Sequence, residues 1–252
     1  MPTFALWIEY DGTAFHGWQR QPGQRTIQGC LEDAVRIIAH RRIAVTGAGR
    51  TDAGVHARAQ VAHFHATGRM NASAWQRALN SELPSDIRIT RAAAASDDFH
   101  ARFSAHRKIY HYRVLNRPWR SPLRDRYVWT VFQPLRRAPM ARAASMLAGR
   151  HDFSRLRASD PHEKNRRNPF CIVFRAKVYR RGDEWVFVFE ADRFLHLMIR
   201  RIVGVLVEIG KGRWDRMVLE RLLAGAESPA APTAPAQGLC LEQVIYHQQF
   251  EA

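Results

Sequence analysis

"TFALWIEYDG", residues 3–12, pairs an alternating apolar pattern with a turn-forming ending. Alternation at every second residue indicates a β-strand with one face packed on a core. The Asp-Gly pair favours a turn, so the strand should end just before it. The positions predicted to face the core are Phe4, Leu6, Ile8 and Tyr10.

The following segments alternate between helix and strand patterns. Thr26 is a suitable N-cap, and apolar residues recur after it at the spacing of a half-buried helix. The positions on that stripe are Ile27, Cys30, Leu31, Ala34, Val35 and Ile38. Residues 71–83 form a second predicted helix, with Asn71 as its cap. Strand-like composition is found at residues 42–47, 59–66 and 86–94.

The rest of the chain repeats this style. Alternation predicts a strand at 108–115, and a shorter one is expected at 126–131. A hairpin is predicted across Arg181-Gly182-Asp183, between strands at 170–179 and 184–192. Helices are expected at 138–149 (ending in Gly149), from about Leu195 to Ile209, and near 215–224. The polar residues 158–169 are predicted to form a loop, and residues 239–246 a final strand.

Helices and strands interleave in both halves of the chain, and hairpins are present. This favours an α+β fold with a largely antiparallel sheet over a doubly wound parallel fold. The pattern changes near residues 100–107, "HARFSAHR". We therefore expect an N-terminal half at 1–105 and a C-terminal half at 106–252.

The 252 residues carry a net charge of +16, although 46% of them are hydrophobic, an ordinary fraction for a globular protein. Such an excess predicts a polyanion as partner, either nucleic acid or an anionic membrane surface. No apolar run approaches the length of a membrane span, which favours nucleic acid. An arginine-rich enzyme with no polyanion partner is the alternative.

Cys30, Cys171 and Cys240 lie far apart, and none has the spacing of a zinc site. Their spacing predicts free thiols in a reducing cytoplasm. A strand-like segment opens the sequence, so we expect no signal peptide. Motifs for ATP, dinucleotides and zinc deaminases are absent, so neither a metal nor a cofactor is predicted.

"AGRTDAGVH", residues 48–56, places one carboxylate in a glycine-punctuated turn. An aspartate in a loop is most often structural, because it bonds the backbone just after it. Arg50 lies two residues from Asp52, and no second carboxylate or metal ligand accompanies them. That pattern favours a lone nucleophile or base over paired acid–base chemistry.

"FHGWQRQPGQRT", residues 15–26, interleaves aromatic rings with hydrogen-bonding and positive side chains. This mixture suits RNA, whose unpaired bases stack and whose phosphates pair with arginine. The candidate contacts are Phe15, Trp18 and Gln19. An equally favoured alternative is that the rings cover the core.

Residues 104–126 spread basic side chains among Tyr110, Tyr112, His111 and Trp119. A charge run is usually a solvated face, but the aromatic residues give an RNA-binding interpretation equal weight. Tyr110 faces the apolar side of its predicted strand. It either packs in the core with its hydroxyl satisfied or stacks on a base.

"RFLHLMIRRIVG", residues 193–204, reads as a helix with an apolar inner side. His196 and Arg200 are four residues apart, so they should share one face of it. Arg200 lies among apolar residues, and a partly buried arginine needs a carboxylate partner. Asp52 is the natural candidate.

Five motifs, in this order, resemble the tRNA pseudouridine synthase A family. They are "FHGWQRQ", "GRTDAGVHA", "FHARFSAHRKIYHY", "FLHLMIRRIVG" and "TAPAQGL", of which the second is the most specific. Together they cover nearly the whole chain. The family tends to have an aromatic residue where this chain has Leu156, and residues 158–169 match it poorly.

The resemblance implies isomerisation of uridine to pseudouridine at positions 38, 39 and 40 of the tRNA anticodon stem-loop, without metal or cofactor. By resemblance, Asp52 is the nucleophile or base, Tyr110 stacks on the target uracil, and Arg200 pairs with Asp52. Arg50 would prop the space left by the extruded base. Further candidates for substrate contacts are Phe15, Trp18, Gln19, His56 and His196.

The same resemblance implies two similar RRM-like α/β halves with a joined, mainly antiparallel sheet and a basic active-site cleft between them. It also implies a cytoplasmic homodimer with tRNA as partner. Two other function classes fit the residues. An RNA-binding or RNA-chaperone module would make no use of Asp52, and a glycosidase would release free uracil instead of conserving mass.

Overall fold

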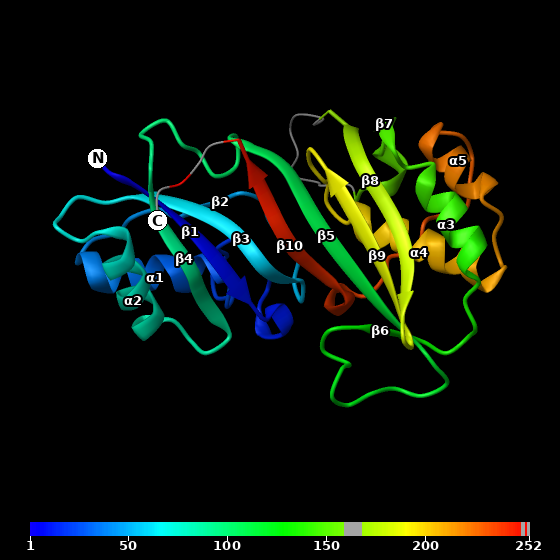
Figure 1. Ribbon diagram of the computed structural model, residues 1–252, viewed down its shortest axis with the longest axis horizontal. Helices are drawn as coiled ribbons and strands as arrows, with labels where there is room; N and C mark the ends of the chain where they lie inside the picture. The colour runs from blue at the N-terminus through cyan, green and yellow to red at the C-terminus, as the bar shows by residue number, and fades with distance from the viewer. Residues whose placement is uncertain (159–167, 248–249, 251–252) are drawn as a thin grey trace. The chain divides into compact units, whose positions relative to one another are not determined.

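The computed structural model describes residues 1–158, 168–247 and 250, and the chain divides into two compact units (Figure 1). Met1–Lys108 and the chain from Cys240 onward form the first unit, and Ile109–Leu239 form the second. The predicted second half, 106–252, therefore differs in its last strand. That strand pairs in parallel with a strand of the first unit, a long-range contact that leaves no local signal in the sequence.

The first unit follows a β-α-β-β-α-β order like that of ferredoxin-like domains. Its strands have the spatial order β4-β1-β3-β10, with β2 beside β3, and β1 is antiparallel to both of its neighbours. In Figure 1, α1 and α2 cover one face of this sheet. The elements are β1 (Thr3–Tyr10), η1 (Gly12–Ala14), α1 (Ile27–Ala39), β2 (Thr46–Gly47), β3 (His56–His65), α2 (Ala72–Glu82), β4 (Ile87–Ala95) and β10 (Leu239–Tyr246).

Both predicted helix caps of this unit are confirmed. The Thr26 hydroxyl accepts a hydrogen bond from the Gly29 N–H at 3.2 Å, and the Asn71 side chain accepts one from the Ala74 N–H at 2.9 Å. Each satisfies a backbone donor that the first helical turn leaves without a partner. The predicted inner face of β1 is buried as well. Two strand boundaries were wrong, since β2 is shorter than 42–47 and β3 begins at His56.

The second unit has the strand order β5-β9-β8-β7, with β6 parallel to β5 and α3 packed on β8 and on α4. The β7–β8 and β8–β9 pairs are antiparallel. Its elements are β5 (Ala105–Asn116, begun in the first unit), β6 (Trp129–Val131), α3 (Arg137–Ser145), β7 (Gly149–Asp152), η2 (Ser154–Leu156), β8 (Phe170–Arg181), β9 (Glu184–Ala191), α4 (Met198–Lys211), α5 (Met217–Leu223) and η3 (Ala236–Gly238).

The predicted hairpin is confirmed, since Arg181 pairs with Glu184 across a turn in which Gly182 has a φ of 62°. The helix predicted at 138–149 ends earlier, at Ser145, because Gly149 (φ 109°) begins β7. The helix predicted from Leu195 begins later, at Met198. The loop predicted at 158–169 lies mostly outside the described residues, because 159–167 belong to no described range.

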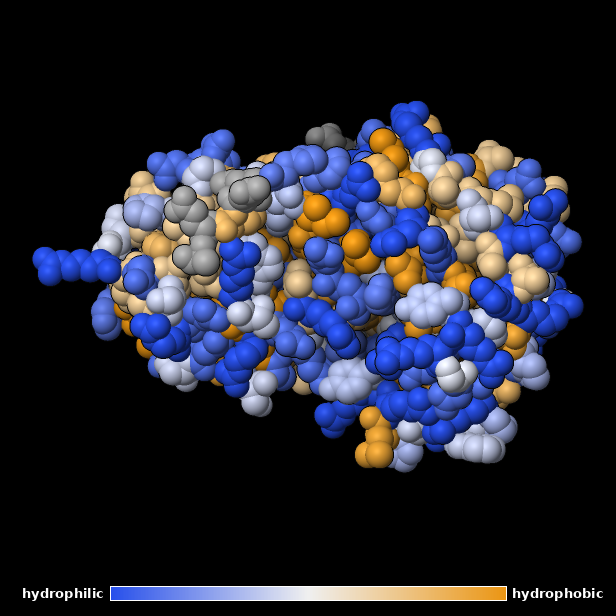
Figure 2. Space-filling model, viewed as in Figure 1, coloured by the Kyte–Doolittle hydropathy of each residue, from blue (hydrophilic) through white to orange (hydrophobic). Residues whose placement is uncertain are grey.

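These features confirm a mixed α/β fold with mainly antiparallel strands. Many hydrophilic side chains, with hydrophobic groups between them, lie on the face seen in Figure 2. Cys30, Cys171 and Cys240 are free thiols, and burial raises the pKa of Cys171 to about 11 and that of Cys240 to about 12. Within the described part of the chain, every helix is too short or too polar to cross a membrane.

Candidate active site

The loop that carries Asp52 is held by very close backbone packing. A Cβ atom on Gly12 would lie 2.1 Å from the carbonyl oxygen of Val55, and one on Gly17 would lie 2.6 Å from that of Thr51. Gly17 also has a φ of 84°, which favours glycine. Gly12 and Gly17 therefore allow the segment from residue 12 to 18 to lie directly on the Asp52 loop.

Hydrogen bonds fix the same two segments. The Trp18 N–H donates to the Thr51 carbonyl at 3.0 Å, and the Gly54 N–H donates to the Phe15 carbonyl at 3.3 Å. The Tyr10 and Thr51 hydroxyl oxygens lie 2.8 Å apart, out of contact with water. Burial raises the pKa of Tyr10, so its phenol stays protonated at neutral pH. The backbone on both sides of Asp52 is thereby immobilised.

Asp52 itself is half-buried, and Arg50 is exposed. The Asp52 carbonyl accepts a hydrogen bond from the Val55 N–H at 3.2 Å, which closes the turn. His56 is buried, and its Nδ1 accepts from the Gly12 N–H at 3.0 Å. The same Nδ1 lies 3.2 Å from the Asp11 carboxylate, but an atom that accepts from N–H carries no proton for an ion pair. The backbone hydrogen bond is therefore the better description of His56.

Phe15 and Trp18 are 3% and 2% exposed. The Arg25 guanidinium lies 4.0 Å from the centre of the Phe15 ring, and a Cβ atom on Gly47 would come within 2.5 Å of the Trp18 indole. This burial favours core packing for both rings. Gln19 is half-buried and donates to the side chain of Gln28 at 2.8 Å.

The second unit carries Tyr110 on β5. Its ring is 6% exposed and meets Phe194 edge-on, with ring centres 5.2 Å apart. Tyr112 points to the same face two residues later and donates from its hydroxyl to the Pro235 carbonyl at 2.7 Å. A Cβ atom on Gly238 would lie 2.6 Å from the Tyr112 ring. The "TAPAQGL" stretch is thus packed directly against this strand.

Arg200, on α4, is hydrogen-bonded to the same stretch. Its Nε donates to the Ala234 carbonyl at 2.8 Å, and its own carbonyl accepts from the Ala234 N–H at 3.0 Å. One turn later, a Cβ atom on Gly204 would lie 2.0 Å from the Pro232 carbonyl oxygen. Burial raises the pKa of Tyr112, and the nearby charge of Arg200 opposes that rise. Three sequence motifs therefore form one packed cluster in this unit.

The prediction that His196 and Arg200 share a helix face was wrong. Leu197 has a φ of 59°, a left-handed conformation, so the helix cannot extend in the N-terminal direction beyond Met198. His196 is therefore in the preceding turn, exposed, with its carbonyl accepting from the Ala158 N–H at 3.0 Å. Helical spacing applies to Arg200 but not to His196.

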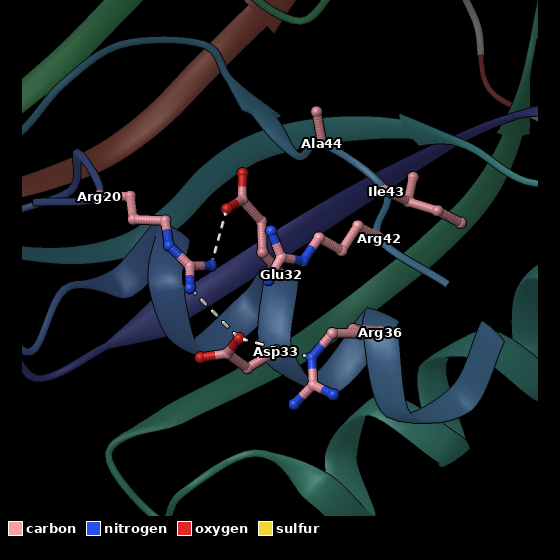
Figure 3. A pocket seen from close by; sticks show the side chains of 7 residues that line it. All are labelled: Arg20, Glu32, Asp33, Arg36, Arg42, Ile43 and Ala44. Atoms are coloured by element: carbon pink, nitrogen blue, oxygen red, sulfur yellow. Dashed lines mark hydrogen bonds and ion pairs between the residues drawn. The ribbon is translucent and has the colours of Figure 1, made fainter. Parts of the chain in front are cut away.

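A hollow of about 330 Å³ lies elsewhere on the first unit (Figure 3). Arg20 bridges Glu32 at 3.0 Å and Asp33 at 3.4 Å, and Arg36 lies 3.9 Å from Asp33. Its lining consists of Arg20, Glu32, Asp33, Arg36, Arg42, Ile43 and Ala44. The carboxylates neutralise much of its positive charge, and none of residues 48–56 lines it, so we assign it no part in the chemistry.

Sequence reasoning missed the positioning residues. These residues are Gly12, Gly17 and Gly204, which lie inside or beside the sequence motifs. The need for glycine at each position becomes visible only when the atom that a Cβ would contact is known. Tyr112 had a usable signal, because it shares a strand face with Tyr110. In the described ranges, no three His, Cys, Asp or Glu side chains gather as a metal site.

Comparison with known proteins gives consistent matches. A family model described as tRNA pseudouridine synthase matches residues 6–104 and 143–247, which leaves 105–142 between the matched segments. A tRNA pseudouridine synthase A from Thiobacillus denitrificans is 43% identical over 251 residues, covering 99% of this chain and 95% of that protein. One from Dechloromonas aromatica is 44% identical over 247 residues, covering 98% and 93%.

Proposed function

Because the chain belongs to the tRNA pseudouridine synthase family, we propose that it isomerises uridine to pseudouridine at positions 38, 39 and 40 of the tRNA anticodon stem-loop. The family assignment supports tRNA pseudouridylation in general. The three positions come from the resemblance of the five motifs, of which "GRTDAGVHA" is the most specific.

Asp52 is the proposed nucleophile. The observation that carries this assignment is the immobilised backbone around it, since the loop is locked at Thr51 and Val55 by glycine contacts and hydrogen bonds. A single carboxylate on a rigid loop can be held at the geometry that attack on the ribose requires. Half-burial also leaves it within reach of a nucleotide that enters from solvent.

The reaction conserves the composition and mass of the nucleotide. The bond from N1 of uracil to C1′ of the ribose breaks, the base turns, and a bond from C5 to C1′ forms. The proton on C5 departs, and N1 gains a proton. Because the base must leave the helical stack first, the enzyme has to offset a cost of a few kcal/mol.

Tyr110 and Arg200 complete the proposal. Stacking of the uracil on Tyr110 would offset roughly 1–3 kcal/mol of the extrusion cost. Arg200 would bind the Asp52 carboxylate and keep it ionised. Since Nε of Arg200 donates to Ala234, the carboxylate would be met by the terminal nitrogens of the guanidinium. Arg50, exposed beside Asp52, would prop the space that the extruded base leaves.

The proposal also covers the partner, the location and the oligomeric state of the protein. We propose a cytoplasmic homodimer that holds tRNA through the excess positive charge of the chain. Direct RNA contacts by Gln19, His56 and His196 are part of the same proposal. His196 has the best support among them, because it is exposed.

The test is tritium release from tRNA that carries 5-tritiated uridine, since loss of the C5 proton accompanies isomerisation. The wild-type protein should release tritium, and Asp52→Ala should release none while binding tRNA nearly as well. No release by the wild type would contradict the proposal. Equal release by both proteins would remove Asp52 from the chemistry, and free uracil in the products would indicate a glycosidase.

A further inference from the structure

The loop between β5 and β6, residues 117–127, carries unusually exposed apolar side chains. Trp119 is 62% exposed and Leu123 is 92% exposed. In Figure 1 this loop runs out beyond the end of β5 before it returns to β6. It lies in the stretch between the two segments that the family model matches. None of the proposed reacting residues Asp52, Tyr110 and Arg200 lies in this loop, so the proposed function leaves it without a role.

Ion pairs of Arg124 anchor the second part of the loop. Arg124 donates to both oxygens of Asp183, at 2.9 and 2.7 Å, and to Glu184 at 3.1 Å. Glu184 is 5% exposed and is also bound by Arg113 at 2.7 Å. These contacts raise the pKa of Arg124 and lower that of Asp183, so both groups are charged at neutral pH. The turn of the β8–β9 hairpin is thus the anchor of the loop.

The first residues of the loop fix the backbone of Trp119. Nε of Arg117 donates to the Trp119 carbonyl at 3.1 Å, and Nη2 of the same side chain donates to the Arg120 carbonyl at 3.3 Å. Nη1 of the same guanidinium lies 3.7 Å from the Asp183 carboxylate. The guanidinium carbon is 5.8 Å from the centre of the Trp119 ring. The backbone that carries the exposed Trp119 indole is therefore fixed, and the Arg117 guanidinium lies beside the ring.

We propose that this loop, which we call the 117–127 platform, is a tRNA-docking element on which Trp119 stacks on an unpaired nucleotide while Arg120 pairs with a phosphate. An indole with neighbouring arginines is the usual arrangement for stacking on single-stranded or extruded bases. The side chain of Arg120 is 73% exposed, and its Nη1 lies 4.0 Å from the Asp125 carboxylate. Because the backbone is fixed in advance, little ordering is needed on binding.

The side chains of the platform match the chemistry of an RNA strand. The platform contains four arginines against one aspartate, and of these arginines Arg117 and Arg124 also face the carboxylate of Asp183 in the hairpin turn. Hydrophilic side chains gather over this region in Figure 2. Phosphate contacts require positive charge, which the exposed Arg120 can supply beside a ring that stacks on a base. The proposal rests on tRNA being the substrate, but it assigns residues outside the reacting centre.

The test measures affinity and not turnover. The probe is an unmodified tRNA transcript with cytidine at positions 38 to 40, so that binding is scored without catalysis. Trp119→Ala should weaken binding by about 5- to 100-fold, and Trp119→Phe should restore most of it, because a phenyl ring also stacks. Arg120→Ala should lower both the affinity and the steepness of its dependence on salt.

Phe170→Ala is the matched control. Phe170 is an exposed aromatic residue of the same unit, 36% exposed, with the Arg150 guanidinium 4.3 Å from its ring centre. Its loss should leave affinity near wild type. Unchanged affinity in Trp119→Ala would overturn the proposal, as would an equal loss in Phe170→Ala or a change in oligomeric state alone. Tritium release by the wild type, measured separately, shows whether the proposed function itself stands.

Discussion

Two loops of this chain are held rigid by different physical means. The loop at 48–56 is locked by backbone hydrogen bonds and by glycines that allow carbonyl oxygens to approach within van der Waals contact. The 117–127 platform is anchored by arginine–carboxylate pairs at a hairpin turn. Packing tolerates almost no displacement, whereas exposed ion pairs weaken in salt. The first arrangement suits chemistry, and the second suits docking of a charged partner.

The largest effect is expected from Gly17→Ala, which disturbs the packing of the loop at 48–56. Its Cβ would lie 2.6 Å from the Thr51 carbonyl oxygen. We expect a loss of about 3 kcal/mol or more in the free energy of unfolding and loss of tritium release. Gly23→Ala is the matched control, since Gly23 shares a positive φ (70°) but has nothing within 4 Å. It should cost only about 1 kcal/mol, measured by urea unfolding. Equal losses would mean that backbone strain, not packing, explains both.

Arg200→Lys tests whether the packed cluster of the second unit serves the chemistry. Lysine keeps the charge but loses the planar fork, including the Nε donor to Ala234. We expect kcat to fall about 100-fold while tRNA affinity changes little. Arg221→Lys, exposed on α5 of the same unit, is the control and should stay near wild type. A normal rate in Arg200→Lys would show that it is not paired with Asp52.

Acid should loosen the first unit through His63. Burial, then the neighbouring His100 and His65, lower the pKa of His63 to about 4. Its Nδ1 accepts from the Ala101 N–H at 3.1 Å, a bond that protonation would break. The unfolded chain takes up this proton near its ordinary pKa of about 6.5. Between these values the unfolded state binds more protons, so stability is complete above pH 6.5 and falls as the pH drops towards 4.

The loss at pH 5 should be about 2 kcal/mol relative to neutral pH. Urea unfolding across this range measures it, and His63→Gln should flatten this part of the profile. His16, exposed in the same unit and not among the groups that lower the pKa of His63, provides the control substitution His16→Gln. An unchanged slope in His63→Gln would assign the acid sensitivity to other groups.

The smallest effect is expected at the platform anchor. Arg124→Ala removes the pairs to Asp183 and Glu184, but Arg113 still compensates the buried Glu184. We expect about 1 kcal/mol of destabilisation that shrinks as salt rises. Arg20→Ala, which also breaks two ion pairs but on a more exposed side chain (51% against 33%), should cost less. A salt-independent loss would mean that Arg124 acts through packing.

Local patterns predicted much of this fold. The β1 alternation and the caps Thr26 and Asn71 were legible because each acts within a few residues. The start of α4 was not, because the left-handed Leu197 has the composition of a helical residue. The pairing of β10 with β3 depends on residues far apart in the chain.

The candidate site divides in the same way. Asp52 stood out as a lone acid between glycines. The purpose of Gly12, Gly17 and Gly204 lay in three-dimensional contacts that no sequence pattern records. Phe15 and Trp18 had the composition of an RNA-binding segment, but their burial places both rings in the core.

The central claim is that one carboxylate, fixed by the packed loop, isomerises uridine in the anticodon arm. The direct measurement is a map of pseudouridine in tRNAs from cells that lack this protein and receive either the wild type or Asp52→Asn. We predict that the wild type restores pseudouridine at positions 38, 39 and 40 and that Asp52→Asn, of nearly equal size, restores none. Restoration by Asp52→Asn, or modification confined to other positions, would contradict the account.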